Sequence, residues 1–435
     1  MKTIRHQEIM FVYQQPTIYS RVAEFAFYLM AAAVLFGTTM PFPETEGFNA
    51  ENTSNIMNQI VFSFLLLSGT FSLIPLRMEA LAILRREKLL IILLAWCTIS
   101  LMWSIYPFVG FKRLVLLLSV SVTSLAVLLH SRNRPNLLSR LKYVIGIYIL
   151  LTIVVCLVLP AAKDPKFHTW RGFEPTKNNL GQVALVCILL LFVTFKSEQG
   201  KRYFSGALLA LTGVVLIGSW SVTSIGVLFG LLGIGLLVWG IDVAFNSAPI
   251  ARLLSIVAIA GFGLLALGAM LWAPELLTTI PKSLGKDITF SGRTYLWESM
   301  WLEIERHWML GTGYAGFWNP ESVGMEVLHE EFVWLPNQAH NGYLDVLNEI
   351  GLVGLFLFAA LIIRYLRDAV ELGEGFYWQW FIVAMLVMNL QESTFLRPHN
   401  AFNVFFLFAY FSLFVEQHFR EVRRFGADDQ LISPN

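Results

Sequence analysis

The stretch NQAHNGYLDVLNEIG, residues 337–351, marks the point where a long polar segment ends and apolar segments resume. The polar segment runs from about Ala273 to Asn341 and interrupts an otherwise almost continuous series of apolar runs. Its polar groups would be rejected by the core of a bilayer, whereas the runs on either side suit membrane-spanning helices. The sequence therefore predicts a loop that carries the chemistry and a scaffold of helices that holds this loop against a membrane surface.

The composition predicts a polytopic membrane protein. Hydrophobic residues make up 56% of the 435 residues and charged residues 14%, against roughly 25% charged residues in soluble domains. The net charge of +1 gives no bulk basic surface, so no nucleic-acid partner is expected. The three cysteines, which lie in apolar runs without metal-ligand spacing, are expected to be small buried residues: Cys97, Cys156 and Cys187.

The expected fold is all-α, with about 12 transmembrane helices of about 20 mostly apolar residues each. A large, partly helical periplasmic loop is expected between spans 9 and 10. In this division, residues 1–272 hold spans 1–9, 273–349 form the loop, 350–416 hold spans 10–12, and 417–435 form a cytoplasmic tail. The predicted spans are 22–40, 56–75, 89–106, 113–130, 143–160, 179–195, 203–220, 222–245, 252–272, 350–366, 376–393 and 400–416.

The distribution of positive charge predicts the orientation. Most of the 31 Lys and Arg residues flank the predicted spans on the side of the N-terminus, and the first loop on the other side, PFPETEGFNAEN (41–52), is purely acidic. Because cytoplasmic loops carry an excess of Lys and Arg, both termini are expected in the cytoplasm. In a bacterial inner membrane the long polar loop, and with it the active site, would then face the periplasm.

Two cations lie near the start of the sixth predicted span. Arg171 and Lys177 belong to the outward segment AAKDPKFHTWRGFEPTKNNLGQ (161–182). The free N–H groups and the dipole of a helix N-terminus attract anions, so the pair is a candidate clamp for a phosphate group. The alternative is that they are interfacial cations that meet lipid headgroups.

The long loop contains a predicted amphipathic helix. Trp297, Trp301, Ile304 and Trp308 recur at helical spacing, and Arg293 lies one turn earlier on the same face. Packing or interfacial anchoring also explains such an aromatic stripe. An arginine that continues the stripe nevertheless needs a partner, and a guanidinium matches two phosphate oxygens at once.

Imidazole and carboxylate groups lie in two further outward segments. His340 precedes an apolar helix, where a neutral imidazole could accept a proton at ambient pH, although a lone histidine is often structural. The last outward turn, QESTFLRPHN (391–400), contributes Glu392, Arg397 and His399. The alternative for this turn is a snorkelling interfacial segment.

These cations and imidazoles come from separate segments that are all expected on one face of the membrane. A cationic pocket with nearby tryptophans suits a substrate that is anionic, bound to the membrane and sugar-bearing. Fixed Arg and Lys charges would stabilise a leaving diphosphate without a metal ion, and aromatic faces would pack on sugar rings. The sequence has no carboxylate motif of metal-ligand spacing and no Gly-rich phosphate loop, so neither a metal nor a cofactor is expected.

Three blocks carry a family resemblance: TWRGFEPTKNNLGQ (169–182), SGRTYLWESMWLEIERHWMLGTGYAGF (291–317) and NQAHNGYLDVLNEIGLVGLF (337–356). They resemble the O-antigen ligase and Wzy-type polysaccharide polymerase family of bacterial inner-membrane glycosyltransferases, which use lipid-linked oligosaccharides. The resemblance implies a metal-independent reaction in which Arg171, Lys177 and Arg293 contact the diphosphate. It implies that His340 is the base or orients the acceptor. Many exopolysaccharide polymerases of this family have His-Lys-Asn where this chain has Thr-Lys-Asn at 176–178, so a second imidazole is missing there.

The predicted function is polymerisation of undecaprenyl-diphosphate-linked repeat units on the periplasmic face, with inversion at the anomeric carbon. The expected partners are a lipid-linked donor, a glycan acceptor, membrane lipids and a chain-length regulator. One alternative is an O-antigen ligase that transfers the glycan to lipid A core, and another, from a different class, is a flippase for the same lipid. The expected site residues are His340, Arg293 and Glu298 for catalysis, Arg171, Lys177, Arg293 and Arg397 for the diphosphate, and Trp170, Trp301, Asn341, Glu392 and His399 for the sugar or acceptor.

Overall fold

The part of the chain that the structure describes is built from helices. This computed structural model describes residues 17–37, 56–131, 137–197, 202–245, 293–319, 336–372 and 378–432. Within these ranges, pairing of extended backbone is limited to one isolated bridge, between Lys163 and Trp170. The helices are α1 (Ile18–Phe36), α3 (Ile56–Leu73), η1 (Ile74–Leu76), α4 (Arg77–Arg86), α5 (Lys88–Ser100), α6 (Pro107–Ser131), α7 (Leu137–Val158), η2 (Pro160–Ala162), α8 (Lys177–Ser197), α9 (Arg202–Ser219), α10 (Val222–Phe245), α13 (Arg293–His307), α15 (Gly342–Leu372), α16 (Trp378–Met388) and α17 (Ala401–Ile432).

Every predicted span that falls in the described ranges overlaps a helix. The predicted ninth span, 252–272, and the loop residues 273–292 lie outside those ranges. Within the described ranges, seven helical segments are long and apolar enough to cross a membrane: α1, α3 with η1 and α4, α6, α7, α8, α15 and α17. Apolar helices that are shorter in their described part are α5, α9, α10 and α16. The protein is therefore a multi-pass membrane protein by helix length and composition, and the total of about 12 spans stays a prediction.

Two predicted spans, 89–106 and 376–393, form helices shorter than expected. They correspond to α5, with 13 residues, and α16, with 11 residues. The described part of α16 ends at Met388, before the predicted end of its span at residue 393. It ends because the Asn389 side chain turns the chain back: its Oδ1 accepts hydrogen bonds from the N–H groups of Thr394 at 2.8 Å and Phe395 at 3.2 Å. The polar turn before α17 therefore starts earlier than predicted.

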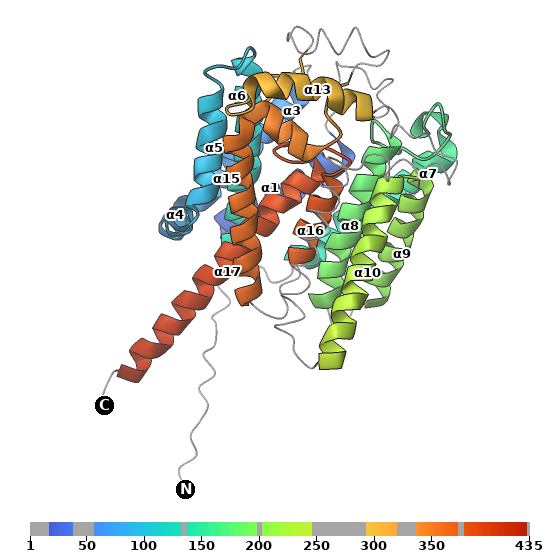
Figure 1. The fold of residues 1–435 in the computed structure, drawn as a ribbon. Helices are drawn as coiled ribbons and strands as arrows, with labels where there is room; N and C mark the ends of the chain where they lie inside the picture. The colour runs from blue at the N-terminus through green and yellow to red at the C-terminus, as the bar shows by residue number, and fades with distance from the viewer. Residues whose placement is uncertain are drawn as a thin grey trace.

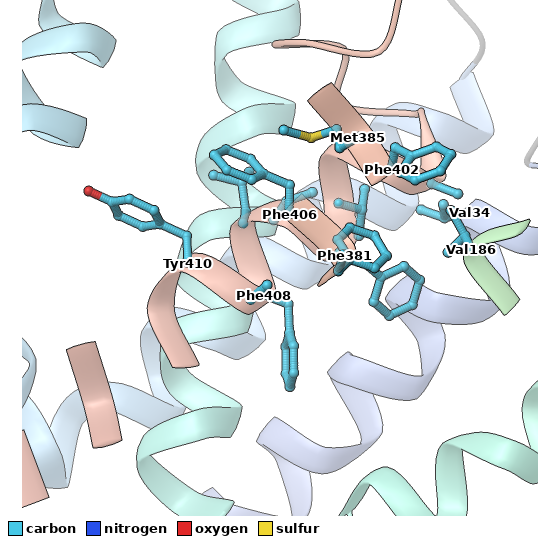
Figure 2. Close-up of a cluster of buried hydrophobic side chains, with 14 of the residues drawn as sticks. Val34, Val186, Phe381, Met385, Phe402, Phe406, Phe408 and Tyr410 are labelled. Atoms are coloured by element: carbon cyan, nitrogen blue, oxygen red, sulfur yellow. The ribbon is translucent and has the colours of Figure 1, made fainter. Parts of the chain in front are cut away.

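The first half of α17 is the centre of the hydrophobic core. Phe402, Phe406, Phe408 and Tyr410 point in different directions around this helix and are all buried. Figure 2 shows side chains from α1, α8 and α16 packed around them, among them Phe381, whose ring centroid lies 5.5 Å from that of Phe402. A helix that is apolar all round must be covered on every side, which explains the central position of α17. Cys97, Cys156 and Cys187 are buried, as predicted.

The helix α13 lies across one end of the bundle, nearly perpendicular to the long axes of α8, α9 and α10, which run side by side on one flank (Figure 1). The far half of α17 extends from the opposite end. Segments predicted to face outward meet at the end that α13 covers. The Trp170 N–H donates to the Gly218 carbonyl at 2.9 Å, and the indole N–H of Trp103 donates to the Gly311 carbonyl at 3.2 Å.

The helix α15 bends at Gly351, next to the predicted boundary between loop and span. Gly351 has a φ of 69°, in the left-handed region that glycine adopts most readily. The groups released by the bend find other partners. The Ile350 carbonyl accepts from the Trp96 indole N–H at 2.9 Å, and the Leu352 N–H donates to the Trp308 carbonyl at 2.8 Å. The chain after α13 therefore packs directly across the bend.

Candidate functional site

Glu392 lies at the centre of a polar cluster that joins four separate segments. It belongs to the turn between α16 and α17, and its side chain is only 2% exposed. Its Oε1 accepts from Nη2 of Arg293 at 3.0 Å and from the amide of Asn178 at 3.2 Å. Its Oε2 lies 3.1 Å from Nδ1 of His340. One buried carboxylate thus connects the start of α8, the start of α13, the segment before α15 and its own turn.

Arg293 is held by more than this ion pair. Its Nη1 donates to the backbone carbonyl of Gln391 and lies 3.2 Å from the side-chain Oε1 of the same residue. Arg293 is the first residue of α13, and the buried face of that helix continues through Leu296, Met300 and Ile304. The spacing of 3, 4 and 4 residues places the guanidinium on the face that packs inward.

The aromatic stripe predicted for α13 is only partly correct. Trp297 does face the site, and its indole N–H donates to the Ala339 carbonyl at 2.8 Å. Trp301, however, is 43% exposed, and Trp308 is exposed as well. The buried face of α13 consists of Leu296, Met300 and Ile304 instead of the tryptophans. Of the predicted stripe, Ile304 belongs to the buried face, whereas Trp301 and Trp308 lie on the exposed flank of the helix.

His340 has a strained backbone that its neighbours hold in place. Its φ of 50° lies in the left-handed region, which costs a non-glycine residue on the order of 1–3 kcal/mol. On one side, the Ala339 N–H donates to Oδ1 of Asp345 at 3.1 Å. On the other, Asn341 caps α15, because its Oδ1 accepts from the Tyr343 N–H at 3.0 Å. The buried Asn341 side chain, predicted to touch the sugar or acceptor, therefore has a structural role.

The negative charge of Glu392 determines which ring nitrogen of His340 carries a hydrogen. Burial alone would raise the pKa of Glu392, but the nearby His340 and Arg293 outweigh it and hold the pKa below its usual value of 4.5. An ionised carboxylate only accepts hydrogen bonds, so the hydrogen of this contact is on Nδ1 of His340. In the tautomer with a single N–H, the lone pair is then on Nε2. The Gln338 amide nitrogen is farther from Nδ1, at 3.4 Å.

Arg397, predicted to bind the diphosphate, forms a second buried ion pair. Its Nη2 donates to Oδ2 of Asp345 at 2.9 Å. Oδ1 of Asp345 also accepts from the Trp318 indole N–H at 2.8 Å, besides the bond from the residue next to His340. Asp345 was not among the predicted site residues, although its place one turn after the NQAHN motif is a signal that could have identified it. The pair fixes the turn before α17 to the start of α15.

The two cations of the 161–182 segment lie beside the start of α8. The buried Arg171 donates from Nε to the Ala161 carbonyl at 3.0 Å and from Nη1 to the Pro175 carbonyl at 3.2 Å. Lys177 is the first residue of α8, and its Nζ lies 4.0 Å from the centroid of the Phe167 ring. The next residue, Asn178, makes the contact with Glu392 described above. The start of α8, with Lys177, is therefore adjacent to the cluster.

Glu174 lies between these two cations in the sequence and was not among the predicted site residues. Burial raises its pKa from 4.5 to about 8, and the Tyr148 O–H donates to its Oε1 at 3.3 Å. The carboxyl group is therefore mainly protonated at neutral pH. It adds little negative charge to a segment whose Arg171 and Lys177 are candidates to bind an anion.

Other predicted residues lie farther from the cluster. Trp170 packs on the end of α9, where a Cβ built on Gly218 would lie 2.6 Å from the indole. Trp301, Glu298 and His399 are exposed, and no contact described for them joins Glu392. Among the described residues, no group of three or more His, Cys, Asp or Glu side chains could hold a metal ion.

Comparisons with known proteins bear on the same region. A family model described as O-antigen ligase matches residues 176–359, a range that includes Lys177, Arg293 and His340. The exopolysaccharide production protein ExoQ of Rhizobium meliloti (strain 1021) is 29% identical to this chain over 203 residues. The similarity covers 45% of this chain and 46% of that relative, so the chain spans about half the length of the curated relative that it matches.

Proposed function

From the match of residues 176–359 to the O-antigen ligase family model and from the similarity to an exopolysaccharide production protein, we propose that the protein is a glycosyltransferase that polymerises lipid-linked glycans. The donor is an oligosaccharide repeat unit on undecaprenyl diphosphate, and the acceptor is a sugar hydroxyl of a second lipid-linked glycan. The reaction takes place on the periplasmic side of the bacterial inner membrane, with both termini in the cytoplasm.

One observation supports this proposal above the others. A guanidinium from α13 and an imidazole from the segment before α15 lie within 3.0 Å and 3.1 Å of the same buried carboxylate. A phosphate-binding cation and a proton acceptor are the two groups that glycosyl transfer from a diphosphate needs. The charges of this cluster gather at one end of the bundle. A flippase of inverted-repeat design would instead have buried charges at mid-membrane.

The roles follow from the chemistry of each group. Arg293 holds the departing diphosphate, with Lys177 and Arg171 of the neighbouring segment as further cations. His340 accepts the proton of the acceptor hydroxyl at Nε2. The hydroxyl oxygen forms a bond to the anomeric carbon from the side opposite the diphosphate, so the configuration inverts.

The acceptor distinguishes polymerase from ligase. The name of the relative, exopolysaccharide production protein, favours polymerisation, whereas the family description, O-antigen ligase, favours transfer to lipid A core. The test is to incubate purified protein in lipid vesicles with lipid-linked repeat units alone. A ladder of products supports the polymerase. Products that form only after lipid A core is added identify a ligase instead.

A His340→Ala variant completes this test, with His307→Ala as the control on the exposed surface of α13. The His340 variant is expected to lose about 100-fold or more in transfer rate, and the control to keep it. If a labelled lipid moves across the vesicle bilayer and no new glycosidic bond forms, the protein is a flippase instead of a glycosyltransferase.

A further inference from the structure

The two oxygens of Glu392 serve different sides of the proposed reaction. Oε1 contacts Arg293, which belongs to the leaving-group side, and Oε2 contacts His340, which belongs to the acceptor side. The carboxylate is too buried to offer much surface to a sugar, since the side chain is 2% exposed. Glu392 is therefore placed to act on the reaction through Arg293 and His340 and not by touching the substrate.

The donor must compete with Glu392 for Arg293. In the structure, Arg293 donates from Nη2 to Glu392 and from Nη1 to the Gln391 carbonyl. A diphosphate offers several anionic oxygens to the same guanidinium, and arginine binds such groups through two parallel hydrogen bonds. Donor binding therefore weakens the hold of Glu392 on Arg293, because the N–H groups of one guanidinium are shared among more acceptors.

We propose that Glu392 is a positioning residue that couples donor binding to the orientation of His340. In the structure, the carboxylate of Glu392 is shared between Arg293 and His340. With donor, the diphosphate takes over Arg293, and Glu392 holds Nδ1–H of His340 so that Nε2 faces the acceptor hydroxyl. This inference rests on the proposed function, and it assigns Glu392 to the imidazole instead of to the sugar.

The step that this arrangement serves is balanced within the site. The acceptor oxygen forms the new bond to the anomeric carbon, and its proton passes to Nε2 of His340. The bond between the anomeric carbon and the phosphate oxygen breaks, and its electron pair leaves with undecaprenyl diphosphate beside Arg293. The ionised Glu392 stabilises the imidazolium formed, as a carboxylate does for other histidines in its position. The proton then passes from His340 to solvent.

The experiment separates binding from transfer. Glu392→Gln keeps the size of the side chain and removes its charge, Glu392→Asp keeps the charge, and Glu305→Gln on the exposed side of α13 is the control. For each purified variant we would measure the affinity for undecaprenyl diphosphate and the transfer rate at saturating donor and acceptor. Glu392→Gln is expected to bind the lipid at least as tightly as wild type, because a negative charge has left the anion site.

The same variant is expected to transfer more slowly by up to about 10,000-fold, as when an amide replaces the carboxylate behind another catalytic histidine. Glu392→Asp is expected to recover part of this rate. A structural role would instead weaken lipid binding and thermal stability together in both variants, and that result would overturn the inference. An unchanged transfer rate in Glu392→Gln would overturn it as well.

Failure of the proposed function has a different signature. A wild-type protein that neither binds undecaprenyl diphosphate nor elongates lipid-linked glycans overturns the proposed function itself. A wild-type protein that does both, with Glu392 variants that lose binding or keep their rate, overturns only the role of Glu392.

Discussion

Arg397 and Asp345 form a buried ion pair of 2.9 Å, and the same aspartate holds the backbone next to His340. Removing one partner of a buried pair costs about 3–5 kcal/mol, because the other charge is left uncompensated. We expect Arg397→Ala to lower the melting temperature of the detergent-solubilised protein clearly. Arg367→Ala, at an exposed position in α15, should lower it little. A stable Arg397 variant with weakened donor binding would show that this arginine serves the diphosphate.

Arg293→Ala should abolish most of the transfer activity. Loss of a charged group that stabilises a leaving group costs about 100- to 1000-fold in rate. Arg306→Ala is the matched control, since Arg306 lies on the same helix with 64% of its side chain exposed. Arg293→Lys should rescue little, because an ammonium cannot bridge Gln391 and Glu392 as the planar guanidinium does. Equal transfer rates for the Arg293 and Arg306 alanine variants would contradict the assignment.

Glu174 should make stability depend on pH between its ordinary value and its raised value. Its folded pKa of about 8 exceeds the ordinary 4.5, so in this window the folded protein binds more protons than the unfolded chain. Stability contributed by this group is therefore lost as the pH rises from 4.5 to about 8. Glu174→Gln should raise the melting temperature relative to wild type at pH 8.5 more than at pH 5.5. Glu305→Gln should show no such difference.

Gly342→Ala should disrupt the start of α15. The Gly342 N–H donates to the Asn389 carbonyl at 2.8 Å, and a Cβ at this position would collide with the side-chain oxygen of the buried Asn389. Both the melting temperature and the transfer rate should fall. Gly226→Ala in α10 is the control, because no atom lies within 4 Å of a Cβ built there. A Gly342 variant as stable and active as the Gly226 variant would contradict the tight contact.

The sequence predicted the helices well because hydropathy reports directly on burial in apolar surroundings. It also singled out Arg293 and His340 as candidate site residues, which the structure brings to one carboxylate and whose roles stay predictions. The sequence could not show that both residues contact Glu392, because Glu392 is far from both in the chain. Local periodicity carries no information about contacts between distant segments. The early end of α16 was missed for a related reason: Asn389 ends the helix through hydrogen bonds that apolar composition does not encode.

The buried face of α13 illustrates a second limit. Tryptophans at helical spacing suggested a stripe that faces the site, yet Leu296 and Met300 are the residues that are buried. Two overlapping apolar stripes share Ile304, and composition alone favours the more aromatic one. What distinguishes them is the neighbouring Phe317 and Trp318, which pack with Leu296 and Met300.

The buried aromatic side chains of α17 are continuous in the chain with the turn that carries the candidate site. The turn that carries Glu392 and Arg397 leads directly into Phe402 and Phe406, so a void opened among those rings shifts the carboxylate even though no polar group has changed. A displacement of about 1 Å at a reacting centre costs on the order of 100-fold in rate. Conservative changes among these phenylalanines, far from any charge, are therefore expected to lower the proposed transfer rate.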